Sequence, residues 1–129
     1  MAFDWKEYVA LALSLQQQAG TAGNPEAVLR SALSRVYYGA FCYARNYARD
    51  WLGFRPRYDG DDHGRLREHL KRTRRRGVSD KLQRLREWRN ESDYQDQLTF
   101  DPESTLGCAL HEARYVFASL APPATPSPP

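Results

Sequence analysis

The sequence lacks the features that mark several large classes of protein. Its 129 residues include only two cysteines, Cys42 and Cys108, which are separated by 65 residues. A disulfide framework and a zinc site are therefore not expected, and both cysteines are predicted to be small buried side chains. The chain also lacks a phosphate-cradling glycine loop, a serine-hydrolase motif and a pair of catalytic carboxylates.

No uncharged apolar run approaches the roughly 20 residues that a membrane-spanning helix needs. Asp4 and Glu7 near the N-terminus are not typical of a secretory signal, which begins with positive charge. We therefore expect a soluble, cytoplasmic protein that does not bind a membrane. Because the sequence offers no cluster of metal-ligating residues, we also expect no metal and no cofactor.

Charge, in contrast, is abundant and segregated along the chain. Of the 19 basic residues 16 are arginine, and 11 basic residues lie within 65–89, whereas 91–112 contains six acids and no Lys or Arg. The densest basic cluster consists of Arg72, Arg74, Arg75 and Arg76. Arginine binds phosphate through two parallel hydrogen bonds, which favours nucleic acid or another polyanion as a partner and makes these four arginines the candidate RNA-binding residues. Arginines at a helix end also suit the helix dipole, and this structural role stays open as the alternative.

Apolar residues recur every three or four positions, which predicts helices, and no stretch shows the alternation of a strand. Capping residues and prolines set the expected helix starts, at Asp4, at Asn24 before Pro25, at Asp62, at Ser79 and at Asp101 before Pro102. The predicted helices cover about 4–19, 25–52 and 63–75, and Gly77 is expected to stop the third. Ser79 begins a fourth helix that Tyr94 ends, and a fifth begins at 102 and reaches 120.

The predicted fold is therefore an all-α, five-helix up-and-down bundle over residues 1–120. The helix over 25–52 is the longest and is expected to be central, with an apolar stripe from Leu29 to Trp51. Residues 121–129 contain five of the eight prolines and are predicted to be a disordered tail.

One charged residue interrupts the apolar pattern. Arg89 lies seven residues after Leu82 and four after Leu85, so it belongs to the apolar stripe of the fourth helix. Burying an unpaired guanidinium costs several kcal/mol. Arg89 must therefore meet a carboxylate, line a wet cleft or face a second subunit, and Asp93, four residues on, is the nearest candidate partner.

Three motifs occur in order along the predicted helices. They are Ser34-Arg35-Val36-Tyr37-Tyr38-Gly39-Ala40-Phe41 on the central helix, His63-Gly64 at the start of the third, and Arg89-Asn90-Glu91-Ser92-Asp93-Tyr94 at the end of the fourth. Together these motifs resemble those of HEPN-domain proteins. The resemblance covers roughly 4–120. It implies a homodimeric helical bundle that acts on RNA in a prokaryotic defence or toxin–antitoxin system, in many members as a metal-independent ribonuclease.

Carried onto this chain, the resemblance makes Arg89, Asn90 and Tyr94 the candidate catalytic residues. In the family motif four to six residues separate the Arg from a His, but this chain has Tyr94, Gln95 and Asp96 at those positions, with Asp93 just before them. Because a tyrosine with pKa of about 10 is a poor base at pH 7, we expect Arg89 to clamp phosphate and Tyr94 to donate or orient. A histidine from elsewhere, or the geometry of the 2′-hydroxyl itself, must supply the rest.

An alternative follows from the missing histidine. The chain is then a catalytically degenerate HEPN module that binds a partner protein, such as a nucleotidyltransferase or a larger effector, or RNA without cleaving it.

Arg35 is expected to pair with Asp93 or Glu91 and so to support the site rather than react. Of the three histidines, His63 is expected to have a capping or turn role at the start of a helix. His69 is expected to pack half-buried, and His111 to face solvent.

Overall fold

The computed structural model describes residues 2–123, which form five α-helices and no β-strand. The helices are α1 (Lys6–Ala19), α2 (Pro25–Trp51), α3 (Asp62–Arg72), α4 (Arg76–Tyr94) and α5 (Pro102–Ser119). The predicted all-α bundle is thus confirmed. Residues 121–123 have no regular structure, and 124–129, the rest of the predicted tail, lie outside the described residues.

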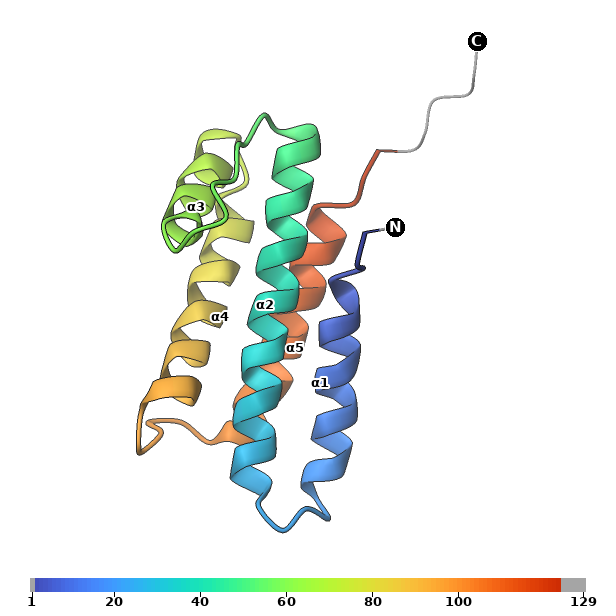
Figure 1. Ribbon diagram of the computed structural model, residues 1–129, viewed down its shortest axis with the longest axis vertical. Coiled ribbons are helices and arrows are strands. Elements are labelled where there is room, and N and C mark those ends of the chain that lie inside the picture. Colours follow the sequence, from blue (N-terminus) through green and yellow to red (C-terminus); the bar gives the residue numbers. More distant parts are fainter. Residues whose placement is uncertain (1, 124–129) are drawn as a thin grey trace.

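Helix α2 is the central element of the bundle (Figure 1). It packs against α1, α4 and α5, and it lies between α1 and α4 with α5 behind it. The short helix α3 packs mainly against α4. One side of α2, between α1 and α4, is therefore left without a covering helix in the described part of the chain. None of the helices within 2–123 is long and apolar enough to cross a membrane.

The capping residues explain where two of the helices begin. The Asn24 side chain accepts a hydrogen bond of 3.3 Å from the Ala27 amide, and Pro25 follows as the first residue of α2. Asp101 accepts one of 2.9 Å from the Ser104 amide, and Pro102 begins α5. These contacts satisfy amides that have no partner within the helix, and they confirm both predicted starts.

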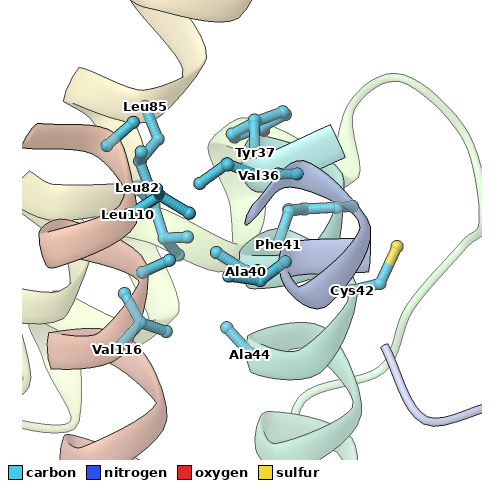
Figure 2. Close-up of a cluster of buried hydrophobic side chains, with 14 of the residues drawn as sticks. Val36, Tyr37, Ala40, Phe41, Cys42, Ala44, Leu82, Leu85, Leu110 and Val116 are labelled. Atoms are coloured by element: carbon cyan, nitrogen blue, oxygen red, sulfur yellow. The ribbon is translucent and has the colours of Figure 1, made fainter. Parts of the chain in front are cut away.

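The core forms where α2 faces α4 and α5 (Figure 2). Val36, Ala40 and Ala44 of α2 are fully buried against side chains that include Leu82 of α4 and Val116 of α5. Two predictions of burial were wrong. Trp51, at the last turn of α2, is 54% exposed, and Cys108 lies on the solvent side of α5. Cys42 is buried as predicted.

The junction between α3 and α4 differs from the sequence prediction. Helix α3 ends at Arg72 because Arg74 adopts the left-handed conformation, with φ of 64°, and the Arg75 amide then donates to the Leu70 carbonyl. That geometry is usual at a helix C-terminus, although glycine is the residue that most often supplies it. Gly77, the predicted stop, instead lies in the first turn of α4, and Ser79 is a buried residue within α4 rather than its cap.

Gly39 brings α1 and α2 close together. A Cβ atom at this position would lie 2.9 Å from the Trp5 carbonyl oxygen and 3.1 Å from Cγ2 of Val9. Only glycine allows this spacing without a shift of the helices. The close approach places Tyr8 of α1 beside the uncovered side of α2.

Candidate functional site

Arg89 is buried, as its place on the apolar stripe predicts. The residue is 6% exposed, and its guanidinium lies between α4 and α2. The carbon at the centre of the guanidinium is 5.2 Å from the ring centre of Tyr37 and 5.1 Å from that of Tyr38. Two aromatic rings of α2 therefore stabilise the cation through their π faces.

The chain supplies this cation with an incomplete set of polar partners. The predicted neighbour Asp93 is present, but its Oδ2 lies 4.0 Å from Nη1 of Arg89, beyond hydrogen-bond distance. The Asp93 oxygen accepts instead from the Ser34 hydroxyl, at 3.2 Å. Among the described residues, Nε of Arg89 is buried with no hydrogen-bond partner. Such a group favours a ligand that brings acceptor oxygens to it.

His63 enters the same site from α3, which the sequence did not predict. Its ring stacks on Phe41 with ring centres 4.2 Å apart, and a hydrogen bond joins its Nδ1 to the hydroxyl of Tyr37. The predicted capping or turn role is wrong, because the residue before the first turn of α3 is Asp61 and the His63 ring points to α2. The second ring nitrogen, Nε2, makes no hydrogen bond within the described chain.

Asp62 explains how His63 reaches α2. It is the first residue of α3 rather than the predicted cap, and it is only 1% exposed. Its carboxylate accepts hydrogen bonds from the amides of Arg57 and Tyr58 and from the Arg65 side chain. Burial raises the pKa of Asp62, but these donors outweigh that effect and the pKa is lowered. The carboxylate thus fixes the connection to the start of α3.

The site carries an excess of positive charge. Arg67, four residues after His63 on α3, donates to the His63 carbonyl at 3.1 Å, and Arg86 of α4 has a buried Nε without a partner among the described residues. Burial, followed by the charges of Arg86, Arg89 and Arg67, lowers the pKa of His63 to about 4. Burial likewise raises the pKa of the Tyr37 phenol well above its ordinary value. His63 and Tyr37 are both neutral at pH 7 as a result.

Arg67, Arg86, Arg89 and His63 therefore form a cationic cluster, named here the Arg89 cluster. Three guanidinium groups approach one neutral imidazole, and no carboxylate within the described residues lies within 4.0 Å of Arg67 or Arg86. Like charges in a partly buried site repel one another, so a bound anion lowers the electrostatic energy. The arrangement suits a phosphate group.

The other predicted catalytic residues are less closely engaged. Tyr94 is 72% exposed, and its ring centre lies 6.0 Å from the Arg89 guanidinium carbon. Asn90 lines a separate hollow of about 340 Å³ together with Glu87, Glu91 and Gln95. The structure thus brings Tyr94 to the edge of the cluster and leaves Asn90 on another face of α4.

Arg35 does not form the predicted pair with Asp93 or Glu91. Its guanidinium carbon lies 4.9 Å from the ring centre of Tyr8 and 5.8 Å from that of Tyr38. Arg35 and Asp93 line one surface hollow, but the neighbouring rings of α1 and α2 hold the guanidinium in place of a carboxylate. Tyr38 therefore has Arg35 and Arg89 near the same ring.

The four predicted RNA-binding arginines are divided among three elements. Arg72 ends α3, Arg74 and Arg75 form the turn, and Arg76 begins α4. Arg72, Arg74 and Arg76 are exposed, whereas Arg75 is half-buried and donates to the Thr73 carbonyl at 2.6 Å. Three of the four are thus free to meet phosphate at the surface.

The remaining histidines behave as predicted. His69 is half-buried and donates through Nε2 to the Leu52 carbonyl at 2.6 Å, and His111 is exposed on α5. Within 2–123, no group of three or more His, Cys, Asp or Glu side chains is arranged to hold a metal ion.

Comparisons with protein-family models, with curated proteins and with solved structures found no match to this chain. Function is therefore inferred from the motifs of the sequence and from the geometry of the Arg89 cluster.

Sequence reasoning identified Arg89 but missed its neighbours. His63 and Arg67 lie four residues apart on α3, and Arg86 and Arg89 lie three apart on α4, so each pair shares a helix face. This spacing is visible in the sequence. That the two faces meet over Tyr37 depends on the path of the connection before α3, which no local pattern shows.

Proposed function

We propose that the protein is a HEPN-type, RNA-directed protein of a prokaryotic defence or toxin–antitoxin system, and that it cleaves RNA without a metal at the Arg89 cluster. The observation that carries the proposal is the buried, incompletely paired guanidinium of Arg89 beside a neutral histidine. A structural arginine at 6% exposure is expected to have its hydrogen bonds completed by its own chain. A phosphate supplies the missing acceptors.

The proposed reaction is attack of a ribose 2′-oxygen on the adjacent phosphorus. The 2′-oxygen–phosphorus bond forms, the bond to the 5′-oxygen breaks, and a 2′,3′-cyclic phosphate results. Arg89 and Arg86 hold the non-bridging oxygens, on which charge builds up in the transition state. His63, with its proton on Nδ1 facing Tyr37, accepts the 2′-hydroxyl proton at Nε2, and Tyr94 donates a proton to the departing 5′-oxygen.

The low pKa of His63 fits this role once substrate is bound. In the free protein burial, and then the charges of the arginines, hold the pKa at about 4, where the imidazole is a weak base. A bound phosphate offsets their charge, and the phosphorane carries still more negative charge. Both effects raise the pKa of His63 toward its ordinary value of 6.5 and strengthen the base. His63 thus supplies the histidine that the motif after Arg89 lacks.

The proposal includes a homodimer in which the uncovered side of α2 faces a second copy. Arg35, Tyr38 and Tyr8 lie on that side, next to Arg89. Aromatic and arginine side chains are common at protein interfaces. Two Arg89 clusters facing one groove double the positive field acting on an RNA strand.

RNA cleavage in EDTA tests the proposed function. We expect the full chain to cleave single-stranded RNA and to leave 2′,3′-cyclic ends. Arg89→Ala is expected to lower kcat at least about 100-fold, as removal of a transition-state donor does in other enzymes. His63→Asn is expected to lower kcat more than Tyr94→Phe. Arg114→Ala, which removes one exposed positive charge on α5, is the matched control.

A folded wild-type protein that leaves RNA intact in EDTA contradicts the ribonuclease proposal. Equal activity of wild type and Arg89→Ala, whatever the products, contradicts the role assigned to Arg89.

A second candidate function is favoured by one observation. Tyr94 is 72% exposed, and a histidine is absent from its neighbourhood on α4. This suits a degenerate HEPN module in which Tyr94 and the arginines contact a partner protein, such as a nucleotidyltransferase or a larger effector. In that case Tyr94→Ala abolishes capture of the partner encoded beside the protein, whereas His63→Asn leaves capture unchanged.

A further inference from the structure

A large surface hollow adjoins the Arg89 cluster and has no role in the reaction described above. It has a volume of about 720 Å³ and lies between the connection at Gly53–Arg55, helix α3 and the first turns of α4. Cavities of this size hold small-molecule or nucleotide-sized ligands. What the hollow binds depends on its charges and on its wall.

Positive charge dominates the lining of this hollow. Five cationic side chains line it against two acidic ones. Two of the five cations are already neutralised, Arg65 by Asp62 at 2.7 Å and Lys71 by Glu68 at 3.3 Å. Arg55, Arg67 and Arg72 have no carboxylate within 4.0 Å in the part of the chain that the structure describes. These three remain available to an anionic ligand.

Arg67 joins the hollow to the Arg89 cluster. It lines the hollow, it donates to the His63 carbonyl at 3.1 Å, and its charge contributes to the lowered pKa of His63. Burial, and then the charge of Arg86, lowers the pKa of Arg67 itself. Arg67 therefore belongs to both the Arg89 cluster and the hollow, and a polyanion bound at Arg89 extends into the hollow past this one side chain.

The wall of the hollow favours phosphate over nucleobases. Phe54 is the apolar ring of the wall, but it is 4% exposed, and the Arg65 guanidinium lies 5.1 Å from its ring centre. A base has no open aromatic face to stack on there. Ser79 also lies on the wall, and its buried hydroxyl has no hydrogen-bond partner among the described residues.

We propose that this hollow binds the sugar–phosphate backbone of the RNA strand next to the cleaved phosphate, through Arg55, Arg67 and Arg72. The inference rests on the proposed function, since it names the substrate as a strand that extends beyond one phosphate. Binding here depends on charge, so it is sensitive to salt and indifferent to the identity of the base.

Two substrates, each with one cleavable bond, distinguish binding at this subsite from the cleavage reaction. One is a ribodinucleotide, and the other is a ten-nucleotide DNA strand with a single ribose at its centre. We expect Arg55→Ala and Arg72→Ala each to raise KM for the longer substrate about 5-fold at unchanged kcat, as loss of a phosphate contact implies. Neither substitution is expected to change KM for the dinucleotide. Arg114→Ala is expected to change neither value.

An unchanged KM for the longer substrate in both variants overturns the subsite, as does an equal rise for the dinucleotide or for Arg114→Ala. If wild type cleaves neither substrate, the proposed reaction fails and the subsite is judged by binding. The probe is then a fluorescently labelled ten-nucleotide RNA, measured by anisotropy. Weaker binding of Arg55→Ala and Arg72→Ala than of Arg114→Ala supports the subsite, and equal binding of all three refutes it.

Discussion

Helix α4 carries one buried charge, Arg89, and packs against another, Glu112 of α5, and the chain pairs these two charges differently. Glu112 of α5 is 5% exposed; its Oε1 accepts from Arg84 at 2.8 Å, and the Lys81 ammonium lies 3.0 Å from Oε2 without hydrogen-bond geometry. Arg89 is 6% exposed; within residues 2–123 it has one carboxylate at 4.0 Å and no hydrogen-bond partner for Nε. The chain supplies two cations to the first charge and leaves the second incomplete, which distinguishes a structural ion pair from a binding site.

The largest expected effect is a loss of folding stability at Glu112, the structural charge of this comparison. Replacing both Lys81 and Arg84 by alanine leaves the Glu112 carboxylate buried without a partner. We expect the free energy of unfolding to fall by about 3 kcal/mol, measured by urea denaturation at pH 7. Lys71→Ala removes an exposed pair with Glu68 and is expected to cost less than about 1 kcal/mol. A loss that is no larger in the double variant than in this control contradicts the structural role of Glu112.

A smaller effect on folding stability is expected from a change of pH, which acts through His63 in the Arg89 cluster. The pKa of His63 is about 4 in the folded protein, below the ordinary value of 6.5, so the unfolded chain binds the proton more readily. Stability that is present above pH 6.5 is therefore lost as the pH falls from about 6.5 to about 4. Urea denaturation across this range measures the loss, and His63→Asn is expected to reduce it.

Saturating single-stranded RNA is expected to flatten the same pH dependence, because phosphate raises the pKa of His63 in the folded protein. An identical pH dependence for wild type and His63→Asn shows that the imidazole does not share the field of Arg67, Arg86 and Arg89.

The smallest expected change in stability comes from the residue at the centre of the proposal. Arg89→Met keeps the length of the side chain and its packing on Tyr37 and Tyr38 while removing the charge. We expect unfolding in urea to change by less than about 1 kcal/mol, because the lost cation–π attraction and the removed burial cost oppose each other. Affinity for single-stranded RNA is expected to fall at least about 10-fold. A stability loss near that of the Lys81 and Arg84 double variant identifies Arg89 as structural.

Much of the fold could be predicted because its signals are local. Asn24 before Pro25 and Asp101 before Pro102 mark helix starts through contacts within one turn. The end of α3 could not be predicted, because a left-handed Arg74 takes the position where glycine is usual. Gly77, the predicted stop, instead lies within the first turn of α4. A Cβ atom there would lie 2.6 Å from the Tyr115 hydroxyl of α5.

The candidate site was predictable only in part, for a physical reason. The burial of Arg89 follows from helical periodicity alone, and the structure agrees. The stacking of His63 on Phe41 requires the connection after α2 to fold back, with Asp62 buried beneath the amides of Arg57 and Tyr58. Tyr58 itself has a φ of 58°, a left-handed backbone conformation that no sequence motif predicts. Contacts that depend on such a path are set by tertiary structure.

The most direct test of the central claim is the NMR signal of the Arg89 Nε–H group during titration with a ten-nucleotide RNA in which every ribose is 2′-O-methylated, so that no 2′-hydroxyl is present to attack and the strand cannot be cleaved. A buried donor without a partner should change when phosphate oxygens reach it. The account predicts a large downfield shift of this proton that saturates with RNA binding, while the Arg84 signal beside Glu112 stays fixed. An Arg89 signal that does not move while RNA saturates the protein contradicts the account.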